Sequence, residues 1–485
     1  LQLGGGLAVN ALGGFIPSYG DSWTIASASG GISGSFAVVA SNFEGVLRPE
    51  LQTIGNDLNL TITALPFVNA ASFTSAEQAE IARALDLIRD SGGMAALSTL
   101  FDSLDPTPLG ELPSTFEALS PLNAFMATGL AESTSALTSD MLSQRRDQLV
   151  NGGGRGFNSA ALRQLGLGPQ FASADPYDVM IMGAAAFADA QEAAADNAGR
   201  MSNMSMRQGW GGFINISTLV DTGYAITPFA GSADVEAING SIGFDRVIAG
   251  GTGFMGAALS YNTGDAEISS LNQSAEVDSF GISLYGGARS GQWRFDGQIG
   301  YSVQSYDLER TVLLLLGAQT LTASPDGDTI ALNAEVGREF AAGANGTITP
   351  FIGLNGTWAA IDGYTEQGGS AAMTVASISG DVFDGRLGVA YRGAFRAGAG
   401  EVRPLVSVAY ATDLADDDNL VAASFAGFPS VPMSFAGVER DDSWVEYELG
   451  LEYEGPRVGV SLSYSASDNG QLDYSAIAGR VSVVW

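Results

Sequence analysis

A Gly-Asp-Ser run at residues 20–22 is the stretch of this chain that most resembles a catalytic element. Its serine, Ser22, could act as the nucleophile of an esterase if a neighbouring base removed the hydroxyl proton. The chain contains no His and no Cys, and all 21 of its basic residues are Arg. A Ser-His-Asp triad therefore cannot form, and the commonest zinc ligands are missing. We expect no enzymatic activity, no metal site and no cofactor.

The charge balance excludes nucleic acid as a partner and points towards lipid. The net charge is -32, whereas phosphate binding depends on clustered Lys and Arg. Charged residues make up only 15% of the chain and hydrophobic residues 46%, against about 25% charged residues in soluble domains. The longest apolar run, TVLLLLGAQTL, is shorter than the ~18 residues that a spanning helix requires. Any membrane span must therefore be built from strands.

Residues 207–485 repeat one pattern, in which apolar and polar side chains alternate with a period of two. In DSWVEYELGLEYE, for example, Val445, Tyr447 and Leu449 share one face, and Glu446 and Glu448 share the other. About a dozen such segments occur, and short Gly- and Asn-rich breaks alternate with longer ones. They begin near Gln208, Glu236, Thr252, Val277, Gln292, Thr329, Thr347, Val382, Val402, Ser443, Arg457 and Tyr474.

Unequal breaks between strands of this length are typical of a transmembrane β-barrel. A soluble sandwich or propeller would also alternate, but it would expose many more charged side chains. We expect the ionised residues of the polar face to line the lumen as an ion-pair network. The predicted lumen-lining residues are Glu335, Asp384, Arg386, Arg392, Glu446, Glu448 and Glu452.

Three segments precede the predicted barrel. Residues 1–67 contain short, Gly-punctuated strands, which suggests a β-helix or solenoid stub. Residues 68–178 read as a helical and Gly-rich linker, including a helix with a capping box from Thr74 to Glu77. Residues 179–206 are rich in Ala and Met, and twelve strands leave room for about one helix. We therefore expect 179–206 to form a helix that threads the lumen.

The order of these parts resembles a monomeric (type Va) autotransporter. The resemblance is based on GFIPSYGDSWTIASASGGISGSFAVV, SAEQAEIARALDLI, LSQRRDQL, GWGGFINI and the repeated hairpins of the C-terminal region. It implies a mainly β fold: a 12-stranded antiparallel transmembrane barrel with a lumen helix, preceded by a helical linker and the end of a β-helical passenger. It also implies location in the bacterial outer membrane, with the N-terminal part at the cell surface.

The resemblance implies particular residues and partners as well. The last strand, with Val481, Val483 and a terminal aromatic residue, would be the signal for the barrel-assembly machinery; Trp485 stands where the family more often has Phe. Some autotransporters cut their passenger inside the barrel at an Asn on the threaded helix, and Asn197 and Asn203 are the candidate positions here. Expected partners are outer-membrane lipid, lipopolysaccharide and periplasmic chaperones. The protein is expected to be a monomer.

Two functions remain open at this point. The first is a translocator that delivers or anchors its own N-terminal passenger at the cell surface. The second is a porin-like channel whose N-terminal domain lies in the periplasm. Since the chain starts at Leu1 without a Met or a signal peptide, we expect it to be a processed or truncated piece of a longer chain.

Overall fold

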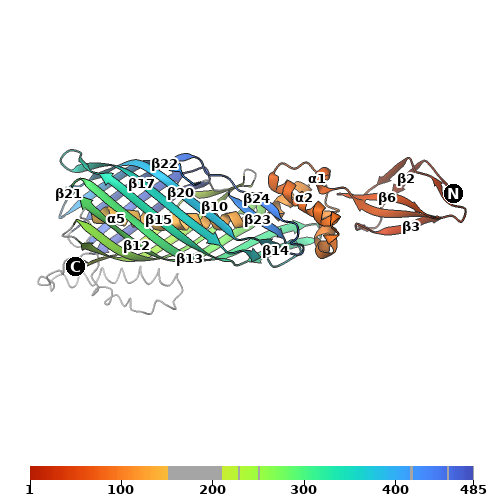
Figure 1. Ribbon diagram of the computed structural model, residues 1–485, viewed down its shortest axis with the longest axis horizontal. Coiled ribbons are helices and arrows are strands. Elements are labelled where there is room, and N and C mark those ends of the chain that lie inside the picture. The colour runs from red at the N-terminus through yellow and green to blue at the C-terminus, as the bar shows by residue number, and fades with distance from the viewer. Residues whose placement is uncertain (151–209, 228–229, 249–251, 416–418, 456–457, 484–485) are drawn as a thin grey trace, which may run out of the picture.

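Twelve antiparallel strands close into a barrel in the computed structural model, which describes residues 1–150, 210–227, 230–248, 252–415, 419–455 and 458–483 (Figure 1). The first strand is interrupted near Asp221, whose φ of 53° bends the chain. The last strand pairs with it and closes the barrel. The strands are β8 (Trp210–Leu219) with β9 (Thr222–Thr227), β10 (Gly231–Ile248), β11 (Gly253–Ile268), β12 (Gln273–Ser290), β13 (Trp293–Leu314), β15 (Asp326–Arg338), β17 (Gly346–Ile361), β20 (Ile378–Gly393), β22 (Gly400–Asp413), β25 (Ser443–Glu454), β26 (Val458–Asp468) and β27 (Leu472–Val483). The predicted twelve-stranded barrel is therefore confirmed.

The two ends of the barrel differ. At the turn end the connections are short, with the small strands β16 (Phe340–Ala341) and β21 (Phe395–Ala397). At the loop end β14 (Gly317–Ala323) forms an antiparallel hairpin with the end of β13, and four strands form a separate antiparallel loop sheet. This loop sheet consists of β18 (Tyr364–Thr365), β19 (Met373–Val375), β23 (Leu420–Phe425) and β24 (Met433–Ala436).

Strand β12 shows how the wall separates two environments. Towards the turn end, Ile282 and Leu284 point outwards and are about half exposed, while Ser283 is buried inside. Towards the loop end the polarity reverses, because Glu276 is exposed on the outside and Val277 is buried inside. The apolar outer face of β12 near Ile282 and Leu284 suits contact with lipid, and the polar inner face there suits a wet lumen. The charged outer face near Glu276 suits contact with water.

Helix α5 (Asn123–Val150) occupies the lumen (Figure 1). It lies within 68–178, the segment predicted to be a linker in front of the barrel. Part of this segment therefore lies inside the barrel. The predicted lumen helix at 179–206 lies outside the described residues. Among the described residues, the helices lack the combination of length and apolar character needed to cross a membrane.

Four helices cap the loop end, namely α1 (Phe67–Ala70), α2 (Ala76–Asp90), α3 (Ser98–Leu104) and α4 (Leu112–Leu119). The cap of α2 is Ser75, whose hydroxyl accepts from the backbone N–H of Gln78. The predicted capping box is thus one residue out of place, because Gln78 and not Glu77 takes the reciprocal position and accepts from the N–H of Thr74. Phe101, Phe116 and Phe425 belong to one apolar core that joins the cap, the loop sheet and the barrel mouth.

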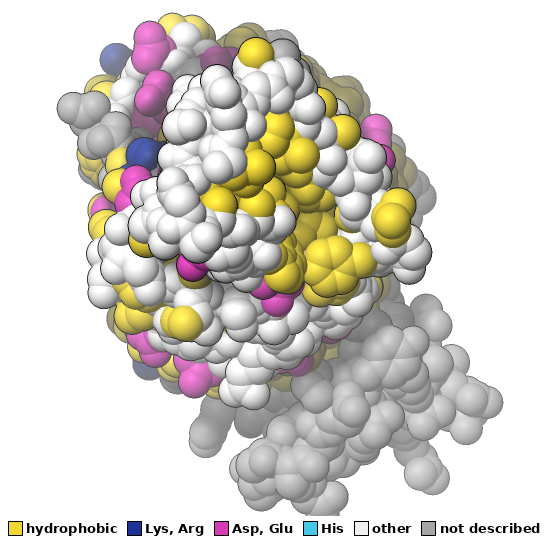
Figure 2. All heavy atoms as spheres, turned by 90° about the vertical axis from the view of Figure 1, so that its right-hand side faces the viewer, with side chains coloured by type: hydrophobic (Ala, Val, Ile, Leu, Met, Phe, Trp, Pro, Cys, Tyr) yellow, Lys and Arg dark blue, Asp and Glu magenta, His cyan; other side chains and the backbone are white. Residues whose placement is uncertain are grey.

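The N-terminal region contains two kinds of strand pairing. Strands β1 (Gln2–Leu3) and β4 (Ser33–Gly34) are parallel, as are β2 (Gly6–Val9) and β5 (Val38–Ser41). Parallel pairing at such offsets is what stacked coils produce. The other three strands of this region instead form an antiparallel sheet in the order β3 (Ser22–Ser27), β7 (Asp57–Ala64) and β6 (Leu47–Ile54). Figure 2 shows hydrophobic side chains exposed along this end of the molecule; the β-helical assignment of 1–67 stays a prediction.

Candidate functional site

Helix α5 is fixed in the lumen by three consecutive ionised residues near its C-terminal end. The first, Arg145, forms two parallel bonds to Asp245 of β10, with Nε–Oδ2 at 2.8 Å and Nη2–Oδ1 at 3.0 Å. The Arg145 guanidinium also lies 5.2 Å from the ring centre of Phe213. The hydroxyl group of Tyr285 donates a hydrogen bond to Asp245 at 3.1 Å. Bidentate pairing of this kind fixes orientation as well as distance.

The second residue, Arg146, bonds to strands β13 and β15. Its Nε donates to Asp296 of β13 at 2.9 Å, and its other nitrogens donate to Gln298 and Asn333. Arg145 and Arg146 are both almost completely buried. Since an unpaired buried guanidinium is costly, the wall must supply these acceptors for the helix to remain in the lumen.

The third residue, Asp147, carries the opposite charge and pairs with Arg294 at 2.8 Å and with Arg392. Arg294 also contacts Glu335. Arg145, Arg146 and Asp147, which we call the RRD anchor, therefore bind strands β10, β13, β15 and β20 together around the helix. This arrangement positions the helix and the wall relative to each other; it brings no nucleophile and base together.

The sequence-predicted lumen residues lie in or beside this network. Glu335 and Arg392 join the RRD anchor, and Glu452 accepts from Gln148 at 2.8 Å. Arg386 pairs with Glu446 at 2.6 Å. The other two residues line a cavity: Asp384, which accepts from Asn355 at 3.0 Å, and Glu448.

Sequence reasoning missed the RRD anchor and its partners Asp245 and Asp296. One signal could have revealed the anchor. The run Gln-Arg-Arg-Asp-Gln follows a helical segment in which apolar and polar residues occur on all sides. A helix without an apolar stripe cannot lie on a single core surface, so it must be surrounded by mixed partners.

The closing strand carries the predicted assembly residues. Val481 lies opposite Val460 of β26 and Ile214 of β8, and Val483 lies opposite Val458. Trp485, Asn197 and Asn203 lie outside the described residues. The assembly and self-cleavage roles therefore stay predictions.

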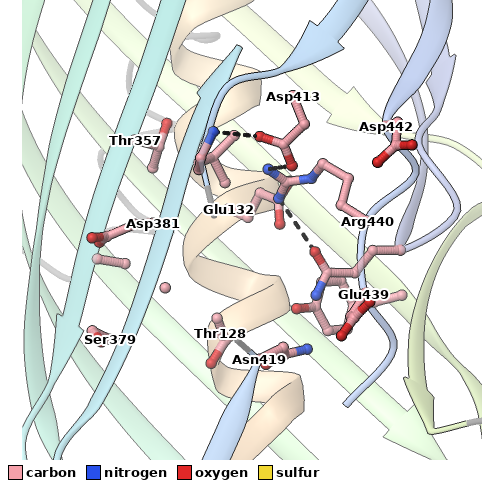
Figure 3. A pocket seen from close by; sticks show the side chains of 16 residues that line it. Thr128, Glu132, Thr357, Ser379, Asp381, Asp413, Asn419, Glu439, Arg440 and Asp442 are labelled. Carbon is pink, nitrogen blue, oxygen red and sulfur yellow. Dashed lines mark hydrogen bonds and ion pairs between the residues drawn. The ribbon is translucent and has the colours of Figure 1, made fainter. Parts of the chain in front are cut away.

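At the loop end a second contact holds α5. Arg440, on the connection from β24 to β25, pairs with Glu132 of α5 at 3.0 Å and with Asp413 of β22 at 3.9 Å. Figure 3 shows this contact at the edge of a cavity of about 210 Å³. Thr128 and Glu132 of the helix lie at the back of the cavity (Figure 3). Ion pairs therefore hold the helix to the barrel near both of its ends, through Glu132 at the loop end and through the RRD anchor near the turn end.

A closed twelve-stranded barrel around a single helix defines a class of outer-membrane translocator domains. The family model "Autotransporter beta-domain" matches residues 208–465, which is more than half of the chain. The chain therefore belongs to the autotransporter family. A comparison with curated protein sequences gave no match.

Solved structures of translocator domains are similar to this barrel. The translocator domain of the autotransporter NalP from Neisseria meningitidis has 15% identity and a TM-score of 0.45, over 62% of this chain and 99% of the other. The β-domain of the Bordetella autotransporter BrkA has 15% identity and a TM-score of 0.40, over 57% and 100%. The transport unit of AIDA-I from Escherichia coli has 12% identity and a TM-score of 0.33, over 61% and 96%.

Proposed function

We propose that this outer-membrane barrel displays its N-terminal part at the bacterial cell surface. The observation that carries the proposal is the path of the chain. The cap and the N-terminal strands all lie beyond the loop end, and α5 then runs through the lumen to the RRD anchor near the turn end (Figure 1). In outer-membrane barrels the longer loops face outwards and the short turns face the periplasm, so residues 1–122 belong outside.

The porin-like alternative is not favoured. A channel needs an open lumen, whereas α5 occupies this one and forms ion pairs with three strands, β10, β13 and β20. The cap helices also share a continuous apolar core with the barrel mouth. Transport, and not catalysis, is the activity that this arrangement supports.

Single-cysteine labelling of intact cells tests the proposal, because the chain has no Cys of its own. Thr24→Cys lies on an exposed N-terminal strand, and Gly291→Cys lies on a turn between β12 and β13. A membrane-impermeant maleimide should label Thr24→Cys in intact cells, and Gly291→Cys only after the outer membrane is broken. The reverse pattern would assign the N-terminal part to the periplasm.

The proposal also extends to partners. The outward apolar residues, such as Leu449 and Leu451 at 52% and 56% exposure, suit contact with outer-membrane lipid and, at the loop end, lipopolysaccharide. Periplasmic chaperones and the barrel-assembly machinery would handle the chain before β27 closes on β8. Depletion of the assembly machinery should therefore leave the protein unfolded, and unchanged folding would argue against this part.

A further inference from the structure

Three cavities follow one face of α5 through the barrel. The first, at the loop end, has a volume of about 210 Å³, the second about 170 Å³ and the third, near the turn end, about 520 Å³. The first and second share Glu132 and Thr357, and the second and third share Glu448. Each volume is several times that needed for a water molecule.

One stripe of the helix borders all three cavities. Thr128 and Glu132 line the first, Glu132, Ala136 and Ser139 the second, and Gln144 the third. Residues three and four apart share a face of a helix, so the cavities adjoin one another along that face. On the remaining side of the helix, Leu137 and Met141 are fully buried, and the cavity beside Ser135 and Thr138 has a volume of only about 30 Å³.

The first cavity begins at the surface. Asp381, Glu439 and Asp442 are exposed at its entrance, whereas Thr128 and Tyr224 are buried at its inner end. Strand β20 pairs with β22 from Asp384 onwards. The part of β20 before Asp384, including residues 379–382, is not paired with β22 and borders the cavity (Figure 3).

The charge of the lining changes along the path. The first two cavities each have five carboxylates against one arginine, Arg440 in the first and Arg386 in the second. The third has as many arginines as carboxylates. One of these arginines is Arg480, which is almost fully buried and donates to Ser461 at 2.9 Å; its Nη1 has no hydrogen-bond partner among the described residues.

We propose that the three cavities form a water-filled path along α5, which admits small cations from the loop end and excludes them at the turn end through Arg480. Carboxylate-lined passages concentrate cations, and arginine side chains repel them. The helix stays in place throughout, because the RRD anchor binds strands β10 to β20 on one side. On the side towards β25–β27, Gln148 bonds to Glu452, and Asp140 accepts hydrogen bonds from Ser465 and Tyr474. The plugged barrel would thus be permeable to ions over most of its depth and sealed only near its turn end.

Cysteine accessibility tests entry. Ser139→Cys would stand in the second cavity, and Ser133→Cys, on the buried side of the same helix, is the matched control. Purified full-length protein is treated with aminoethyl or sulfonatoethyl methanethiosulfonate, which are similar in size and opposite in charge, and the mass increase is followed with time. We expect the cationic reagent to modify Ser139→Cys at least roughly tenfold faster, and Ser133→Cys to remain unmodified. Equal rates for the two reagents, no reaction at Ser139→Cys, or reaction at Ser133→Cys would each overturn the proposal.

Ion currents test the barrier. In planar bilayers Arg480→Gln should raise the cation current severalfold over the unsubstituted protein, whereas Arg338→Gln, on the outer surface, should leave it unchanged. Heat-modifiable gel mobility would verify that both variants are folded. A folded Arg480→Gln variant with an unchanged current, or with a current carried by anions, would contradict the assigned barrier.

Discussion

Arg145 on the lumen helix and Asp245 on β10 form a buried bidentate ion pair one hundred residues apart in the chain. Asp245 also accepts a hydrogen bond from the hydroxyl group of Tyr285 on β12. One carboxylate therefore connects the helix to two strands. Because both charges are shielded from water, each requires the other.

Breaking this pair should destabilise the barrel. Asp245→Ala leaves a buried guanidinium without its carboxylate, and we expect a loss of about 3–5 kcal/mol, measured by urea unfolding in detergent or by the temperature of the heat-modifiable gel shift. Arg83→Ala is the control, because its pair with Glu80, three residues away on α2, is partly exposed to water, and a water-exposed pair is worth less than about 1 kcal/mol. Similar losses for both variants would contradict a specific role for the anchor.

The sequence was sufficient to predict the barrel but not what fills it. Alternation along a strand such as β25 is local information, so strand number and the inward or outward direction of Leu449 and Glu448 follow from it. The partner of Arg145 depends on which of twelve strands faces the helix, and that depends on closure and stagger. Helix α5 is retained by charges that match those of the wall, and these partners lie far from it in the chain.

Close packing between α5 and the barrel mouth provides a second test. Gly129 of α5 lies against the ring of Tyr224, and a Cβ at Gly129 would come within 2.5–2.8 Å of that ring. Tyr224 is 1% exposed and belongs to the apolar core, so Gly129→Val should cost about 1–3 kcal/mol. Gly110→Val is the control, since nothing lies within 4 Å of its added Cβ. Thermal unfolding followed by circular dichroism would measure both, and a neutral Gly129→Val would indicate that the helix is loosely held.

The cap should respond to pH through Asp105, at the C-terminal end of α3. Burial raises its pKa from 3.8 to about 6, although Arg89 beside it acts in the opposite direction, and the carboxylates of Asp86 and Asp102 add to the rise. A raised pKa in the folded state means that the protonated form stabilises the cap. This stabilisation is complete below about pH 4 and is lost as the pH rises through about 6.

Hydrogen exchange of the amides in α2 and α3 would measure this effect. We expect more protection at pH 5 than at pH 7, and a smaller difference in Asp105→Asn, whose side chain does not titrate. Burial also raises the pKa of Glu117 and of Asp86, so part of the difference should remain in the variant. Protection that increases from pH 5 to pH 7 would contradict the assignment.

The position of the membrane on the barrel can be tested along one strand. Leu284 and Glu276 of β12 both point outwards. Leu284 is 57% exposed, in the apolar stretch with Ile282 and Phe280. Glu276 is opposite Asp265 on one side and Asp307 on the other, so three carboxylates lie side by side on neighbouring strands.

The same substitution should therefore have opposite results at the two positions. Leu284→Arg would place a charge against lipid and should cost about 2–4 kcal/mol if the site lies near the middle of the bilayer. Glu276→Arg would replace like-charge repulsion with two attractive cross-strand pairs, each worth roughly 0.2–1 kcal/mol, and should be neutral or stabilising. Unfolding in lipid vesicles would measure both variants. A large loss at Glu276→Arg would mean that the lipid extends over the carboxylates, and a small loss at Leu284→Arg would mean that it does not reach the middle of β12.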